Sequence, residues 1–178
     1  MSTGHIEYAA FQGTHVFKLF GEVRAHSCMS LDHLLDTIER QDVVTGALVD
    51  LTEATFIDST TLGMLAKLGL QLHEHRGFQV VMLSTNPDIT TLANSMGLNQ
   101  IFVMVNCKGS DQCFTETLPE ECPDHLAMLH TVLEAHRTLM NLNASNRAMF
   151  EPLVTQLEKE EIRQQQAASS FLSTSQAR

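Results

Sequence analysis

The sequence predicts an α/β fold, with a mixed, mainly parallel sheet and a C-terminal helical extension. Up to Val105, short apolar runs of strand length alternate with segments of helical periodicity, in the order β-β-α-β-α-β-α-β. After Pro123 the strand-like runs stop and helical periodicity alone remains. Strands that alternate with helices indicate parallel pairing through right-handed crossovers. An opening hairpin adds one antiparallel pair.

The first elements are two strands, a helix and a third strand. Residues 5–20 carry two strands around Gln12-Gly13, where the glycine favours a turn. Residues 30–40 predict a helix that Ser30 caps. Residues 46–51 form an apolar run that suits the middle of a sheet.

The alternating part continues with a helix over residues 62–75, a strand over 78–85, a helix over 89–96 that Asn86 or Asp88 begins, and a strand over 100–105. Gly77 and Gly97 follow the two helices, as glycine commonly does at helix ends. We therefore assign residues 1–107 to one domain.

The rest of the chain is divided into a linker and a helical hairpin. Residues 108–122 are polar and predict a linker, whereas residues 123–178 carry two amphipathic helices separated by a break at 141–145. Pro152 is expected near the start of the second helix or at a kink in it. The tail from Gln164 is expected to be mobile. The hairpin either covers one face of the domain or provides a second surface for binding or homodimerisation.

Composition narrows the classes of function. The chain has 178 residues, of which 43% are apolar, and a formal net charge of -10. This acidity argues against direct nucleic-acid binding and against anionic membrane surfaces, since both require basic surface. Neither a stretch of membrane-spanning length nor a signal peptide is present, so we expect a cytoplasmic protein.

A metal site is not expected. Four possible zinc ligands lie in one part of the chain: Cys107, Cys113, Cys122 and His125. Their spacing matches no common zinc motif. We expect reduced thiols there, and no cofactor.

One segment places a carboxylate and three hydroxyl side chains next to one another, where a strand turns into a helix. It is Phe56-Ile57-Asp58-Ser59-Thr60-Thr61-Leu62-Gly63. A helix start leaves backbone N–H groups without partners, and an Asp58 or Ser59 oxygen can accept one of them. Capping explains one of these oxygens and leaves the others unexplained.

Catalysis explains them poorly. A nucleophilic serine needs a base and an oxyanion hole, yet Ser59 lacks the flanking glycines of the G-x-S-x-G turn, and the sequence identifies no histidine as its base. We therefore do not expect an enzyme. Phosphorylation is a third explanation, because a helix N-terminus tolerates a phosphate while a partner packed over the same turn would meet a new dianion.

The stretch "ALVDLTEATFIDSTTLGMLAKL", residues 47–68, resembles the signature of STAS domains, the family of bacterial anti-sigma factor antagonists. Val49-Asp50-Leu51 resembles the end of the signature strand, Phe56-Ile57-Asp58-Ser59 the phosphorylation segment and Leu62-Gly63 the helix opening. The resemblance extends over roughly residues 5–106 and includes the order of elements. Thr60-Thr61 departs from the commoner Ser-Gly.

The resemblance implies a regulatory protein without catalytic activity. It implies that Ser59 is the phosphate acceptor and that the partner-binding residues are Asp58, Ser59, Thr60, Thr61 and Gly63. Its partners would be an anti-sigma factor with serine-kinase activity, bound only by the unphosphorylated form, and a serine phosphatase. The alternative is a STAS subunit of a membrane transport ATPase.

Overall fold

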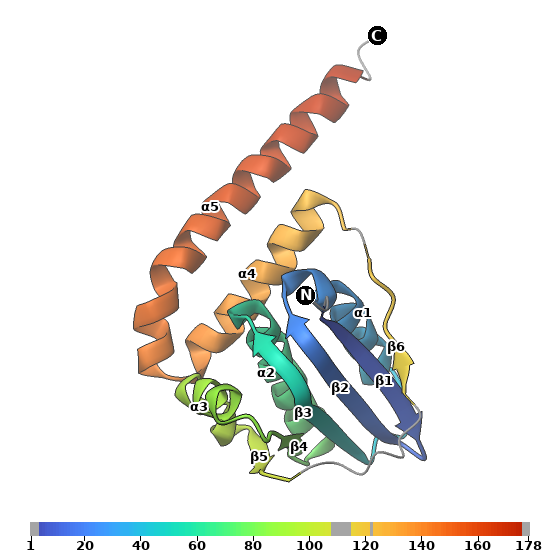
Figure 1. Ribbon diagram of the computed structural model, residues 1–178. Helices are drawn as coiled ribbons and strands as arrows, with labels where there is room; N and C mark the ends of the chain where they lie inside the picture. The colour runs from blue at the N-terminus through green and yellow to red at the C-terminus, as the bar shows by residue number, and fades with distance from the viewer. Residues whose placement is uncertain (1–3, 108–114, 122, 176–178) are drawn as a thin grey trace.

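The computed structural model describes residues 4–107, 115–121 and 123–175, with side chains described up to residue 167. Its strands form a six-stranded sheet in the order β5-β4-β3-β2-β1-β6 (Figure 1). They are β1 (His5–Phe11), β2 (Thr14–Val23), β3 (Gly46–Ile57), β4 (Val80–Leu83), β5 (Phe102–Val105) and β6 (Glu116–Thr117). Strands β2 to β5 pair in parallel, whereas β1 pairs antiparallel with both β2 and β6. The mixed α/β fold with C-terminal helices is thereby confirmed.

The helices are α1 (Cys28–Glu39), α2 (Ser59–Arg76), α3 (Pro87–Ser95), α4 (His125–Leu142) and α5 (Ala144–Ser175). Short 3-10 turns lie at η1 (Ala25–Ser27) and η2 (Leu98–Gln100). Helices α1 and α2 lie next to each other behind the sheet as drawn in Figure 1. Gly77 ends α2 at a φ of 75°, a left-handed conformation that glycine adopts readily.

The core lies between the sheet and these helices. Alternate residues of β2, from His15 to Val23, point inward, so Phe17 and Leu19 are fully buried while Lys18 is partly exposed. The central strands contribute Val49, Leu51, Val80 and Met82 to the same cluster. These positions agree with the strand periodicity in the sequence.

The start of α1 differs from the expectation. The helix begins at Cys28, and Ser27 at its N-cap makes no side-chain cap bond within the described residues. Ser30, expected to be the cap, lies inside the helix and donates its hydroxyl hydrogen to the Pro119 carbonyl oxygen. The serine therefore serves a contact with a distant segment, which helix-start patterns do not reveal.

The predicted linker also has a structural role. Its residues Glu116 and Thr117 form β6, which extends the sheet beyond β1. Helix α5 continues without interruption through Ser175 and includes both Pro152 and Gln164. The break between the two helices falls at Asn143.

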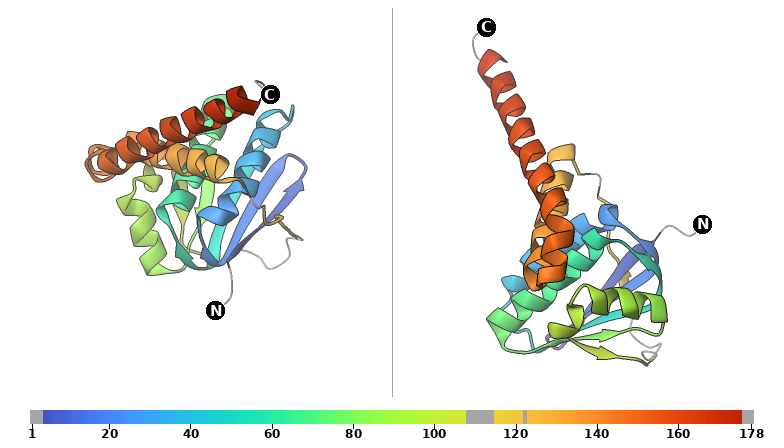
Figure 2. Two further views of the ribbon diagram at one scale, coloured as in Figure 1. Left: turned by 90° about the horizontal axis from the view of Figure 1, so that it is seen from above. Right: turned by 90° about the vertical axis from the view of Figure 1, so that its left-hand side faces the viewer.

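The C-terminal helices form a second layer outside the domain's own helices. Helix α4 packs against α2 on one side and against α5 on the other. Helix α5 packs chiefly on α4, and its C-terminal half extends beyond the rest of the molecule (Figure 2). The start of α2, with its Asp-Ser-Thr-Thr segment, consequently lies beneath α4.

Candidate functional site

The turn between β3 and α2 is organised by Asp58. Its Oδ1 accepts hydrogen bonds from the Thr61 backbone N–H at 2.8 Å and from the Thr61 hydroxyl at 2.8 Å. Its Oδ2 accepts from the Ala25 backbone N–H at 2.8 Å. One carboxylate therefore caps α2 and ties it to the turn before α1.

Thr61 belongs to the interior. Its side chain is 0% exposed, and its hydroxyl lies 3.4 Å from the Cys28 thiol. Burial raises the pKa of that thiol to about 12, so Cys28 stays protonated and chemically quiet near neutral pH. The hydroxyl of Thr61 is thus a structural group of the α1–α2 contact.

Ser59, the first residue of α2, faces helix α4. Its Oγ lies 2.9 Å from Nε2 of His136, and Nδ1 of the same ring lies 2.7 Å from the Val132 carbonyl oxygen. A carbonyl oxygen can only accept, so Nδ1 carries a hydrogen, and Nε2 shares a hydrogen bond with the Ser59 hydroxyl. The His136 side chain is 4% exposed, and its ring packs edge-on against Phe150 of α5.

Gly63 lies one turn after Ser59, on the same face of α2. A Cβ atom at this position would lie 2.3 Å from the Ala135 carbonyl oxygen and 2.8 Å from the Ala135 Cα. Helices α2 and α4 therefore meet here backbone against backbone, and glycine is required because any side chain would collide with main-chain atoms.

The five predicted partner-binding residues do lie together at the start of α2, but they are used differently. Thr60, Thr61 and Gly63 are buried, while Asp58 and Ser59 are partly exposed. The sequence analysis found no base near Ser59, and the structure places His136 there. That residue lies on the strong amphipathic helix of the extension, and its distance along the chain gave no sign of the contact.

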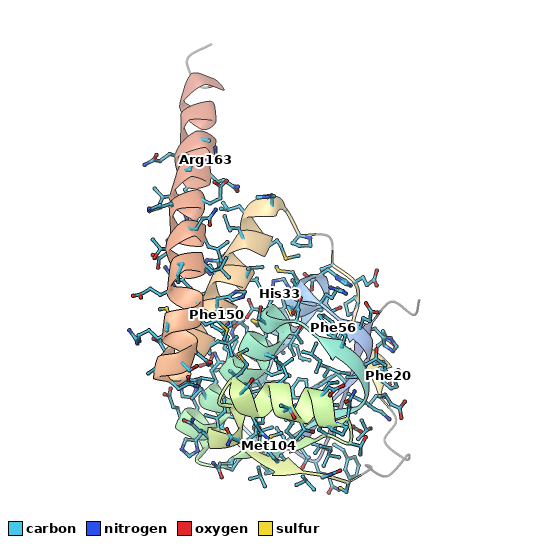
Figure 3. The ribbon with its side chains drawn as sticks, turned by 60° about the vertical axis from the view of Figure 1, so that its left-hand side comes forward. Phe20, His33, Phe56, Met104, Phe150 and Arg163 are labelled. Carbon is cyan, nitrogen blue, oxygen red and sulfur yellow. The ribbon has the colours of Figure 1, made fainter. Side chains whose placement is uncertain are left out.

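Beside the covered turn lies an exposed aromatic group. Phe56, near the end of β3, is 41% exposed, and the Arg24 guanidinium lies 4.5 Å from its ring centroid. Arg24 also pairs with Glu22 at 3.0 Å. Figure 3 shows Phe56 apart from Phe150, which lies on α5. This part of the turn's surroundings remains open to solvent.

The Ser59–His136 pair resembles the first two members of a nucleophile–base arrangement. The group that orients the imidazole is the Val132 carbonyl of the preceding turn of α4, which fixes the tautomer without supplying a carboxylate charge. The arrangement holds the ring firmly against Ser59 and joins the two helices.

The structure describes two of the four possible zinc ligands, Cys107 and His125. Cys113 and Cys122 lie outside the described residues, Cys107 is a free, exposed thiol, and His125 bonds to Gln164. Within the described part of the chain, no group of three or more metal-ligating side chains occurs. Nor does a helix among those residues have the length and hydropathy needed to cross a membrane.

Comparisons with known proteins identify the domain. The family model of the STAS domain matches residues 5–112. Two solved structures share 20% sequence identity with the chain: the anti-sigma factor antagonist SpoIIAA in its unphosphorylated form, and the Bacillus cell fate determinant SpoIIAA in its phosphorylated form. The first covers 60% of this chain and 90% of its own, with a TM-score of 0.49; the second covers 57% and 91%, with a TM-score of 0.48. A search of curated proteins gives no match.

Proposed function

The chain belongs to the STAS domain family, and from this premise we propose that it is an anti-sigma factor antagonist controlled by phosphorylation of Ser59. The unphosphorylated form binds an anti-sigma factor through the start of α2, the segment of Asp58, Ser59, Thr60, Thr61 and Gly63, hereafter the switch surface. Ser59 and Gly63 lie on its face toward α4, and Thr61 supports it from the interior. A serine kinase, the anti-sigma factor itself in the simplest scheme, ends this binding, and a serine phosphatase restores it. Such a protein acts in the cytoplasm and needs no catalytic activity of its own.

The observation that carries the proposal is the division of roles between Asp58 and Ser59. Asp58 supplies the cap of α2, so the Ser59 hydroxyl is not needed to hold the helix start. A phosphate on Ser59 would lie at the N-terminus of an 18-residue helix, where the helix dipole favours negative charge. The domain can therefore carry the modification while its binding surface changes by nearly two charges.

The neighbouring threonines are poor acceptors by comparison. The Thr61 hydroxyl donates to Asp58 and is 0% exposed, and Thr60 is 5% exposed. A kinase needs the acceptor oxygen in its own active site, so we propose that Ser59 is the main site of phosphorylation.

Affinity capture tests the proposal. Ser59→Ala, Ser59→Asp and the matched control Ser95→Asp, at an exposed serine of α3, are used as bait, and bound proteins are identified by mass spectrometry. We expect an anti-sigma factor with Ser59→Ala and with Ser95→Asp, and at least tenfold less of it with Ser59→Asp. Equal recovery with all three baits would contradict the switch, and recovery of a transport ATPase would favour the alternative.

A homodimer through the C-terminal helices, one of the two alternatives for this hairpin, has a candidate surface. Met149 and Leu153 are exposed on α5 four residues apart, so they share one face of the helix. Sedimentation of the wild type and of Met149→Glu tests it, since a dimer through this face would dissociate in the variant.

A further inference from the structure

We propose that helix α4 is a built-in competitor of the anti-sigma partner: it occupies the switch surface, and the partner binds only when α4 leaves it. This inference rests on the proposed function and adds a regulatory step to it. The relevant contacts are those of Ser59, Gly63 and the residues of α4 that cover them.

The first step concerns the phosphate acceptor. The Ser59 hydroxyl is hydrogen-bonded to His136 at 2.9 Å, and the imidazole is held in place by Val132 and Phe150. A kinase must place the same oxygen in line with a phosphoryl group and remove its proton. The oxygen is therefore engaged by α4 while the extension is docked.

The second step concerns space. At Gly63 the two helix backbones are so close that even one added carbon atom would lie 2.3 Å from the Ala135 carbonyl oxygen. A partner side chain or helix cannot enter between them. Helix α4 and an anti-sigma factor that contacts Gly63 consequently exclude each other.

The third step concerns how α4 can leave. It is joined to α5 by an ion pair from Arg137 to Glu158 at 2.8 Å and by a hydrogen bond between His130 and Glu161 at 2.9 Å. Because α5 rests chiefly on α4 (Figure 2), the two helices would leave together and keep their mutual contact. Their departure breaks the bond from Asn146 to the Met96 carbonyl oxygen at 2.8 Å and the bond from Thr131 to the Met29 sulfur at 3.0 Å. The chain before them is anchored to the domain by the hydrogen bond that Ser30 donates to the Pro119 carbonyl oxygen.

The fourth step concerns the first encounter. Phe56 and Arg24 stay exposed beside the switch surface while α4 is docked. A partner can contact this rim first and then replace α4. The apparent affinity for the partner equals the affinity of the open form multiplied by the fraction of molecules that are open. A weaker α4 contact increases this fraction and must therefore raise the apparent affinity.

The test uses the full chain and an alanine-to-glutamate pair. Ala135→Glu introduces a charge into the buried α2–α4 contact, whereas Ala148→Glu places the same residue on the exposed surface of α5. Amide hydrogen exchange of residues 58–66 and 128–139 reports docking without any partner. Affinity for the anti-sigma factor obtained in the capture experiment reports competition.

We expect at least tenfold faster exchange in both segments of Ala135→Glu, and at least tenfold tighter binding of the anti-sigma factor. Ala148→Glu should match the wild type in both measurements. His136→Ala, which removes the partner of Ser59 and the ring that packs on Phe150, gives a smaller change in the same direction and replaces Ala135→Glu if that variant does not fold.

Faster exchange with unchanged or weaker binding would overturn the competition, as would unchanged exchange in both opened variants. If no variant binds an anti-sigma factor, the opened ones included, the proposed function fails, and the competition fails with it. Hydrogen exchange reports the docking of α4 without any partner. It therefore distinguishes a protein in which α4 does not cover the switch surface from one that binds no anti-sigma factor.

Discussion

Helices α2 and α3 both start directly after a parallel strand, but their first turns are used differently. Asp58 caps α2 by accepting from the Thr61 N–H, and Asn86 caps α3 by accepting from the Asp88 N–H. The start of α3 is open to solvent at Pro87 and Asp88. The start of α2 is covered by α4.

The difference separates the side-chain bonds that cap a helix from those that connect it to distant parts of the chain. At α3, the side-chain bonds remain local: Ser84 pairs with Thr90, six residues away. At α2, Asp58 bonds to Ala25, 33 residues away, and Ser59 bonds to His136, 77 residues away. A single oxygen is enough to cap a helix, so the additional oxygens at α2 serve tertiary contact and, in our proposal, regulation.

Removing the C-terminal helices should have the largest effect, because it leaves α2 as exposed as α3. A fragment of residues 1–121, which keeps β6, is expected to stay folded. It should lose about 5–9 kcal/mol in free energy of unfolding, because three large side chains of the extension, Leu133, Leu139 and Phe150, belong to the same buried cluster as the sheet. Dispersed NMR peaks matching those of the full chain, together with urea unfolding, test this. A collapsed spectrum would show that the extension is part of the domain's core.

The next largest difference should come from the caps themselves. Asp58→Ala should lower the free energy of unfolding by about 2–4 kcal/mol, since it removes a cap and leaves the Ala25 N–H without its partner. Asn86→Ala should cost about 1 kcal/mol, the ordinary price of a lost cap. Urea unfolding of both variants measures the difference. Equal losses would mean that the long-range bonds of Asp58 add little stability.

Two glycines of α2 allow the α4 contact to be measured within one helix. Gly63→Ala forces a Cβ against the Ala135 backbone, whereas Gly69→Ala meets ring atoms of the Phe102 side chain at 3.0 Å, which can shift. Both gain the same helix propensity, so we expect Gly63→Ala to be less stable than Gly69→Ala by about 1–3 kcal/mol. Thermal unfolding measures both stabilities. Equal values would contradict the close approach of the α2 and α4 backbones.

The Ser59–His136 bond should contribute a smaller amount. A double-mutant cycle of Ser59→Ala and His136→Ala is expected to give a coupling free energy of about 0.5–1.5 kcal/mol. The cycle is needed because His136→Ala alone also loses the packing on Phe150. A coupling near zero would show that α4 is held by its backbone and apolar contacts alone.

A second buried histidine supplies the last and smallest test. His15 accepts or donates at Nδ1 to the Tyr8 hydroxyl, while its Nε2 is buried without a partner in the described residues. Burial lowers the pKa of His15. Its contribution to stability is therefore fully present above the unfolded pKa of about 6.5 and is lost as pH falls through the folded value.

His15→Gln should accordingly flatten the decline of stability between pH 7 and pH 5. The control His26→Gln, at an exposed histidine, should keep the wild-type slope. Urea unfolding across this pH range gives both slopes, and identical slopes in all three proteins would rule out His15 as a source of acid sensitivity.

The sequence predicted the order of the first eight elements because period-2 and helical patterns are local. The burial of Val49 and Leu51 follows from the apolar run over residues 46–51. Strand β6 was not predicted, since two polar residues pair with β1 only through backbone bonds. The Ser59–His136 contact was not predicted either, because it depends on how the extension docks, which no local pattern specifies.

The contact at Gly63 also limits how mutations there can be compensated. The colliding atoms belong to the Ala135 main chain, which every amino acid possesses. In a genetic screen for suppressors of Gly63→Ala, no replacement at position 135 should therefore restore the original packing, not even glycine. Revertants should instead map to residues that let the whole helix shift, so position 63 should stay glycine in related sequences whichever residue occupies position 135.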